Sequence, residues 1–217
     1  MPIDRSGVPF LVAAAIPAVA LVVLDLLWWA VPFVIVSGVF LFFFRDPARH
    51  PPRAKGLVLA PADGRILVAG EVVSGDPPEG TWWQVSIFLS PIDVHINRVP
   101  IGGEVTHVHR QSGKFLAAYR SEASSSNERT EVAFRHNDVV IVCRQIVGVL
   151  ARRIVCRVSV GHEVHAGDRF GIMKFGSRID LFIPRTATIA VVQGQRVRGG
   201  ESVVARLQGD EKPEGGL

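Results

Sequence analysis

The chain has 217 residues, of which 48% are hydrophobic, and it carries a formal net charge of +4. This length allows one domain, or one domain with an appendage. The mild basic charge does not indicate nucleic-acid binding, because the arginines do not form a dense run with interleaved aromatic residues. The two cysteines, Cys143 and Cys156, lack C-x-x-C spacing, so we expect neither a metal site nor a disulfide scaffold.

Most of the hydrophobic excess lies in residues 8–44, where two apolar segments flank Asp25. A membrane-spanning helix needs about 20 apolar residues. The second segment, 26–44, comes close to that length, and the first, 9–24, is slightly short. Two arrangements fit: a helical hairpin that crosses twice and turns near Asp25, or one spanning or re-entrant helix whose partner lies in the interface. Residues 1–45 are therefore predicted to be a membrane anchor. A cleaved signal peptide is disfavoured, because no small-residue cleavage site follows.

The anchor is followed by a proline-rich linker, residues 46–56. Its basic flank consists of Arg45, Arg49, Arg53 and Lys55. Positive charge beside a span marks the cytoplasmic side of the membrane. Residues 57–207 are therefore predicted to face the cytosol from the cell membrane, whose anionic surface suits the basic charge. Residues 208–217 are predicted to be a disordered tail.

Residues 57–207 have the pattern of short strands and turns. The strands predicted from apolar alternation are 57–60, 65–69, 84–89, 139–143 and 152–158. The polar stretch 112–129 is predicted to be a long loop that can hold a short helix, and loops of this length are often functional.

A weak internal repeat occurs in the last third of the chain. Gly161-x-x-Val-x-x-Gly-Asp168 recurs as Gly194-x-x-Val-x-x-Gly-Glu201, with glycine at the turns and valine expected inside. This unit resembles the barrel-sandwich hybrid fold of biotinyl and lipoyl carrier domains. The predicted fold is therefore mainly β: a barrel-sandwich-hybrid-like domain preceded by one or two membrane helices.

The most informative polar residues are Gly176 and Ser177, within the apolar segment 170–184. A lone Gly-Ser dipeptide is typical of an ordinary turn between strands. Here it lies in apolar strand sequence between two basic residues. Two other polar residues in hydrophobic surroundings, Asp63 and His95, are available to meet it.

Six motifs occur in order along the chain. They are Phe43-Phe-Arg-Asp-Pro47, Pro61-Ala-Asp-Gly64, Phe88-Leu-Ser-Pro-Ile-Asp-Val-His-Ile-Asn-Arg-Val-Pro100, Gly113-Lys-Phe115, Asn127-Glu-Arg129 and Lys174-Phe-Gly-Ser-Arg178. Together they resemble the short form of phosphatidylserine decarboxylase over residues 40–185. The resemblance implies a carboxy-lyase that converts phosphatidylserine to phosphatidylethanolamine. It also implies self-cleavage between Gly176 and Ser177, a covalent pyruvoyl cofactor derived from Ser177, and two product chains that stay associated.

The residue types at this dipeptide suit that chemistry. Ser177 Oγ must attack the carbonyl carbon of Gly176, and glycine leaves that carbonyl open and lets the backbone strain. A base must take the hydroxyl proton, and a base must later take the Cα proton of Ser177. The resulting ketone is an electron sink, which is the role of pyridoxal phosphate in other enzymes.

The resemblance also assigns an acid and a histidine. Asp63 matches the aspartate of the family's Asp-His-Ser processing triad, in which the acid orients an imidazole. His95 matches the first of two histidines in the long bacterial forms, and Arg98 replaces the second. His95 is thus expected to serve decarboxylation, and either it also drives self-cleavage or another histidine enters. The other histidines that we considered are His107, His109, His136, His162 and His165.

Three arginines are candidates to bind the lipid phosphodiester, because a guanidinium group matches phosphate geometry. They are Arg98, Arg45 and Arg49. Ordinary positive charge on the cytosolic flank explains Arg45 and Arg49 equally well. Lys114 and residues 127–129 are candidates for the head-group site, without assigned roles.

Two other functions compete with the decarboxylase. Met173-Lys174 is similar to the Met-Lys hairpin that carries biotin, so a biotinyl or lipoyl carrier domain is one alternative. It explains neither the Asp63 motif nor the His95 motif. A non-enzymatic membrane-anchored adaptor is the other, and it predicts one intact polypeptide.

Overall fold

The structure is a computed structural model that describes residues 2–149, 153–174 and 176–208. The chain forms two compact units, Met1–Ala48 and Arg49–Leu217. The predicted disordered tail lies outside the described residues except for Gln208.

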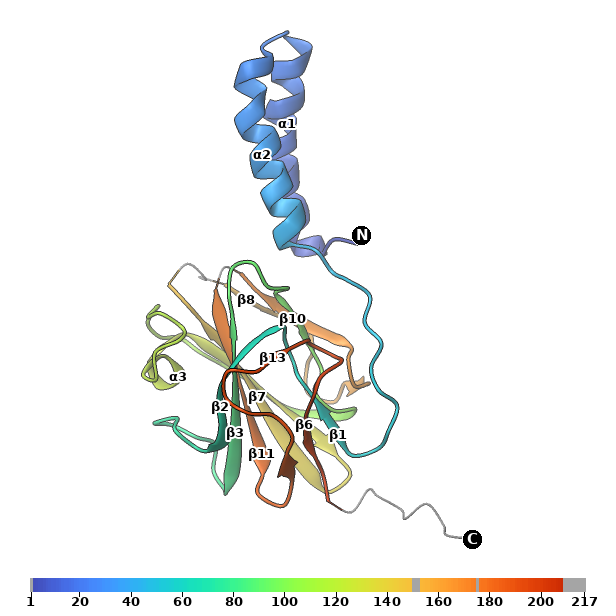
Figure 1. The fold of residues 1–217 in the computed structure, drawn as a ribbon, viewed down its shortest axis with the longest axis vertical. Helices are drawn as coiled ribbons and strands as arrows, with labels where there is room; N and C mark the ends of the chain where they lie inside the picture. The colour runs from blue at the N-terminus through green and yellow to red at the C-terminus, as the bar shows by residue number, and fades with distance from the viewer. Residues whose placement is uncertain (1, 150–152, 175, 209–217) are drawn as a thin grey trace. The chain divides into compact units, whose positions relative to one another are not determined.

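The first unit is a helical hairpin. It consists of a short 3-10 helix, η1 (Arg5–Gly7), followed by α1 (Val8–Val23) and α2 (Leu27–Phe43). Asp25 turns the chain between the two long helices with a φ of +59°, a conformation that Asp tolerates better than most residues. The helices lie side by side (Figure 1), and the Phe10 ring contacts those of Phe40 and Phe44 at centroid distances of 5.5 and 5.4 Å. The predicted turn at Asp25 is confirmed.

The two helices differ in length from the sequence prediction. Arg5–Val23 forms a helical stretch of 19 residues that is long and apolar enough to cross a membrane, whereas Leu27–Phe43 is shorter. The sequence instead predicted that the second segment is close to spanning length and that the first is slightly short. The difference arises because η1 extends the first helix toward the N-terminus, beyond the apolar run.

The second unit is built mainly of antiparallel strands. Its elements are β1 (Leu57–Leu59), β2 (Gly64–Glu71), β3 (Trp82–Leu89), β4 (Ile96–Arg98), β5 (Gly103–Gln111), α3 (Ala123–Ser126), β6 (Arg129–His136), β7 (Val139–Val147), β8 (Ile154–Cys156), β9 (Glu163–Val164), β10 (Arg169–Met173), β11 (Ser177–Pro184), β12 (Thr188–Ile189), β13 (Arg196–Val197) and β14 (Val203–Arg206). They form one sheet in the order β13-β2-β3-β11-β7-β6-β5-β9 and two small sheets, β1-β14-β12 and β4-β10-β8. The short helix expected within 112–129 is confirmed as α3, whereas β5 and β6 were not predicted.

The two small sheets belong to a duplicated arrangement of strands. Leu57 and Ile96 begin β1 and β4, and they are 39 residues apart; Gly64 and Gly103 begin β2 and β5 at the same spacing. Main-chain hydrogen bonds relate the copies reciprocally. The N–H of Leu59 donates to the carbonyl of Pro100, and that of Arg98 donates to the carbonyl of Pro61, each at 2.8 Å.

The glycine repeat is the second part of this duplication. Its four turn glycines, Gly161, Gly167, Gly194 and Gly200, all have φ between +78° and +87°, a left-handed conformation that glycine adopts without steric cost. The repeat places the two-residue strands β9 and β13 at opposite ends of the large sheet. The repeat found in the sequence thus marks one part of a larger structural duplication.

The strand that carries the candidate serine, β11, lies between β3 and β7. Side chains alternate across a strand. Ile179, Leu181 and Ile183 belong to the main hydrophobic core, so Ser177 points to the same side, while Arg178 and Asp180 point to the other.

Candidate active site

The Gly176-Ser177 dipeptide lies where the chain enters β11. Gly176 has a φ of +72°. A Cβ atom at Gly176 would meet no atom of the described residues within 4 Å. Glycine is therefore favoured here by backbone conformation and not by lack of space. Ser177 is the first residue of the strand and lies opposite Leu89 and Val147. Phe175, which precedes the dipeptide, lies outside the described residues.

His95 contacts this dipeptide directly. The main-chain N–H of Gly176 donates to His95 Nε2 at 3.2 Å, and His95 Nδ1 lies 2.9 Å from the carbonyl oxygen of Asp93. A carbonyl can only accept and an amide N–H can only donate, so Nδ1 carries the proton and Nε2 offers its lone pair. The fully buried imidazole is therefore neutral, with its basic nitrogen facing the dipeptide.

The Ser177 hydroxyl is buried without a hydrogen-bond partner in the described part of the chain. Leaving a buried hydroxyl unpaired costs about 1–3 kcal/mol. Buried hydroxyls without a partner are uncommon in native proteins. The Ser177 hydroxyl also adjoins a left-handed glycine whose N–H is bonded to a neutral histidine, which is a setting suited to a nucleophile.

Asp63 is held by partners other than the imidazole. Its Oδ2 accepts from Arg49 Nη2 at 2.7 Å, and its Oδ1 accepts from the Gly199 N–H at 2.8 Å. Arg49 also pairs with Glu201, whose pKa is lowered chiefly by the hydrogen bond from the His50 N–H. The structure therefore brings His95 to Gly176-Ser177, and the partners that it gives Asp63 are Arg49 and Gly199.

A buried ion pair follows Ser177 directly. Arg178 Nε donates to Asp180 Oδ1 at 2.6 Å, and Arg178 Nη2 donates to Ser86 Oγ at 3.0 Å. The other carboxylate oxygen of Asp180 accepts from Ser124 Oγ at 2.6 Å. Removing one partner of such a buried pair typically lowers the stability of the folded protein by about 3–5 kcal/mol. The pair therefore fixes the first residues of β11 after Ser177 against β3 and α3.

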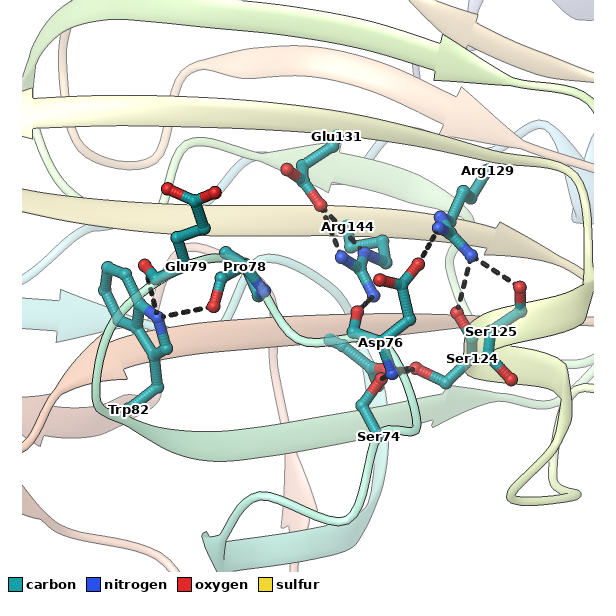
Figure 2. Close-up of polar contacts among 11 residues, drawn as sticks. Ser74, Asp76, Pro78, Glu79, Trp82, Ser124, Ser125, Arg129, Glu131 and Arg144 are labelled. Carbon is teal, nitrogen blue, oxygen red and sulfur yellow. Dashed lines mark hydrogen bonds and ion pairs between the residues drawn. The ribbon is translucent and has the colours of Figure 1, made fainter.

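Ser124 connects this pair to a second polar network, drawn in Figure 2. Its hydroxyl lies 3.0 Å from Ser74 Oγ, and its carbonyl accepts from Arg129. Arg129 is ion-paired with Asp76, whose carbonyl accepts from Arg144 Nη1 at 2.6 Å. The network holds the β2–β3 connection and α3 onto β6 and β7. Arg129, which the sequence left without a role, thus has a structural one.

Asn127 closes the long loop over the site. Its Oδ1 accepts from the Leu116 N–H at 2.9 Å, and its Nδ2 donates to the carbonyls of Leu116 and Val147, each at 2.8 Å. The side chain is almost fully buried. It fixes the loop to the end of β7, opposite Ser177.

The same loop forms one wall of an apolar pocket. The pocket is lined by Phe88, Pro91, Ala117, Ala118, Tyr119, Val149 and Gly176. The Tyr119 ring contacts Phe88 edge-on at a centroid distance of 6.2 Å, and Tyr119 and Val149 are largely exposed. An apolar surface therefore leads from solvent to the Gly176 backbone.

Comparisons with known proteins agree with this geometry. A family model for phosphatidylserine decarboxylase matches residues 36–205. The chain belongs to the phosphatidylserine decarboxylase family. It is 43% identical over 201 residues to a phosphatidylserine decarboxylase proenzyme of Pelodictyon phaeoclathratiforme, covering 91% of this chain and 93% of the relative. It is 41% identical over 210 residues to the proenzyme of Mycolicibacterium smegmatis, covering 95% and 90%.

Decarboxylases of this family form their pyruvoyl group from their own chain, and the residues present fit that origin. The buried, unpartnered Ser177 hydroxyl is the observation that supports the fit. The carrier and adaptor alternatives do not explain family membership over most of the chain.

The candidate phosphate ligands have defined surroundings in this decarboxylase. Arg98 is buried, with 6% of its surface exposed, and its Nη1 donates to the Gly167 carbonyl at 3.0 Å. In the hairpin unit, Arg45 Nη1 donates to the Phe42 carbonyl at 2.7 Å, and its guanidinium lies over the Phe42 ring. These contacts favour a structural role for Arg98 over direct phosphate binding.

The other histidines lie elsewhere on the second unit. His107 and His109 stack on β5 at a centroid distance of 6.0 Å. His136 Nδ1 lies 2.7 Å from the Gly102 carbonyl, and His165 pairs with Asp168. His95 is the histidine that the described structure joins to the dipeptide.

Sequence reasoning missed two parts of the site. The Asp93 carbonyl, not a carboxylate, holds His95 Nδ1, and the Asp93 side chain shares a polar pocket with Asp63. The Asp180 carboxylate was missed as well, although its alternation with Arg178 along β11 was a usable signal, because residues two apart share one face of a strand.

Proposed function

We propose that this phosphatidylserine decarboxylase proenzyme cleaves itself between Gly176 and Ser177, and that Ser177 becomes the pyruvoyl group. The observation that carries the proposal is the buried, unpartnered Ser177 hydroxyl next to a left-handed glycine whose N–H is bonded to His95. The mature protein then removes carbon dioxide from phosphatidylserine and leaves phosphatidylethanolamine.

Self-cleavage proceeds through an ester. Ser177 Oγ adds to the Gly176 carbonyl carbon, the Gly176–Ser177 amide bond breaks, and the freed nitrogen takes a proton. A base then removes the Ser177 Cα proton, and the Gly176 carboxylate leaves as the new end of the large chain. Water hydrolyses the remaining enamine, releasing ammonia and leaving a ketone.

His95 is the proposed base. Its Nε2 lone pair already faces the dipeptide and needs only to exchange the Gly176 N–H for the Ser177 hydroxyl. The Asp93 carbonyl keeps the proton on Nδ1, which fixes the tautomer without a carboxylate. Asp63 is proposed to act indirectly, by shaping the polar pocket that it shares with Asp93.

The pyruvoyl ketone supplies the electron sink for decarboxylation. His95 is proposed to return a proton to the substrate carbon, since a buried neutral imidazole beside Ser177 can accept and release protons. The apolar pocket at Gly176 is proposed to take the part of the lipid next to its head group.

The duplicated half of the second unit is proposed to be barrel-sandwich-hybrid-like. Two small sheets of equivalent order and four left-handed turn glycines support this finer assignment. After cleavage the large and small chains are proposed to stay together, because β11 is hydrogen-bonded on both sides to strands of the large chain, β3 and β7.

Purified protein is expected to contain two chains, of 176 and 41 residues, because a cut after Gly176 leaves 41 of the 217 residues. The small chain should be one ammonia lighter than its sequence mass, and it should resist Edman degradation until reductive amination converts its ketone. Intact mass spectrometry tests this. A single uncut chain, or a small chain with a free serine amine, contradicts the proposal.

The protein is expected to remain in the membrane fraction after alkaline carbonate extraction. The Arg5–Val23 helix is apolar enough to span, and the basic flank after α2 favours a cytosolic second unit. Protease should therefore digest residues beyond 48 in inverted vesicles but not in intact spheroplasts. Digestion in intact spheroplasts overturns the orientation.

A further inference from the structure

Gly148 directly follows the last residue of β7, Val147, and contacts the carbonyl group of the bond to be cut. A Cβ atom at Gly148 would lie 2.2 Å from the carbonyl oxygen of Gly176 and 3.2 Å from its carbonyl carbon. Separations below 3.0 Å do not occur for real Cβ atoms, so any side chain at Gly148 would have to displace that carbonyl. The backbone of Gly148 is not in the left-handed region, so it is this contact, and not its φ, that requires glycine.

The contact is fixed from both sides. On the Gly148 side, the preceding Val147 accepts a hydrogen bond from Asn127 and donates one to the Glu128 carbonyl. On the Gly176 side, the N–H is bonded to His95 and Ser177 pairs with Val147. Neither segment can move away without breaking buried hydrogen bonds.

We infer that Gly148 is a positioning residue for self-cleavage, which holds the Gly176 carbonyl so that its carbon faces Ser177 Oγ. The Cα–H that takes the place of a side chain points at the carbonyl oxygen, as in weak C–H···O contacts. As Oγ adds, that oxygen becomes negatively charged, and the polarised Cα–H stays beside it. The inference rests on the proposed cleavage site.

The test follows cleavage during cell-free synthesis of the full chain in lipid nanodiscs. Gly148→Ala is expected to slow formation of the 41-residue chain about 100-fold, because a displacement of about 1 Å at a reacting group has that effect. Hydroxylamine, which cuts esters, should release no small chain from the stalled precursor, since the fault precedes ester formation. Thermal melting checks that the precursor is folded.

Gly171→Ala is the matched control. A Cβ at this buried strand glycine would lie 2.5 Å from the Val155 carbonyl oxygen, a similar clash that does not involve Gly176. It should lower the melting temperature but leave cleavage at the unsubstituted rate. If Gly148→Ala alone does not fold, the test uses the same change in an Ala118→Gly chain, because Ala118 Cβ is the other near neighbour, at 3.3 Å.

The outcomes separate the inference from the proposed function. Cleavage of Gly148→Ala at the unsubstituted rate, or a hydroxylamine-sensitive ester in that variant, overturns the positioning role. Equal loss of cleavage in Gly171→Ala overturns it too. An unsubstituted chain that cleaves elsewhere, or not at all, instead overturns the cleavage site itself.

Discussion

Ser177→Ala is expected to leave the chain as one polypeptide and to reduce phosphatidylserine decarboxylation to the uncatalysed level. The substitution removes both the nucleophile of self-cleavage and the atoms that become the pyruvoyl group. It should not unfold the protein, because the hydroxyl has no hydrogen-bond partner to lose within the described residues. Intact mass and release of labelled carbon dioxide from phosphatidylserine measure the two effects.

Ser90→Ala is the control for this experiment. The Ser90 hydroxyl is likewise buried without a partner in the described structure, and it lies in the connection that leads to His95. Removing it should leave cleavage and decarboxylation intact. A cleaved Ser177→Ala chain is incompatible with Ser177 as the source of the pyruvoyl group, and an equal loss in Ser90→Ala would show that the effect is not specific to Ser177.

Features with a local cause were predictable from the sequence. The turn at Asp25 and the glycine turns of the repeat depend on the conformational preferences of single residues. The meeting of His95 with Gly176-Ser177 was expected from the ordered motifs, and the hydrogen bond between His95 and Gly176 supports it.

Features that depend on strand register were not predictable. Gly148 contacts the Gly176 carbonyl only because β7 pairs with β11 at Val147 and Ser177. The acceptor for His95 Nδ1 is a main-chain carbonyl. Every residue type has such a carbonyl, so the amino-acid sequence does not reveal it. The sequence therefore suggested a carboxylate, Asp63, for a place that the backbone fills.

A comparison of the two copies of the duplication shows which candidate site residues occur in only one copy. The spacing of 39 residues that relates β1 to β4 also relates Asp63 to Gly102, His95 to Gly56 and Arg98 to Leu59. The turn glycines are shared by both copies, whereas these polar residues occur in only one. The shared glycines therefore serve the fold, and of the three unshared residues His95 is the one bonded to Gly176, whereas Asp63 and Arg98 bond to Gly199 and Gly167.

His95→Ala is expected to slow self-cleavage and to lower decarboxylation by any cleaved fraction about 10²- to 10⁴-fold, the usual contribution of a general acid or base. His95→Gln is the sharper variant. Its amide oxygen can take the place of Nε2 and accept from the Gly176 N–H, but it cannot take up a proton near neutral pH. If His95 transfers protons, Gln should be as defective as Ala; if it only holds the dipeptide, Gln should restore cleavage.

Two further variants complete that experiment. His136→Ala removes an imidazole whose Nδ1 is likewise near a carbonyl, that of Gly102, and it should leave both reactions unchanged. Asp63→Asn weakens the pairing with Arg49 but leaves the Asp93 carbonyl on the imidazole, so its effect should be smaller than that of His95→Gln. An Asp63→Asn chain that fails to cleave while His95→Gln cleaves normally would reverse the two roles. Normal cleavage of His95→Ala with a decarboxylation defect would restrict His95 to the second step, and another base would then drive processing.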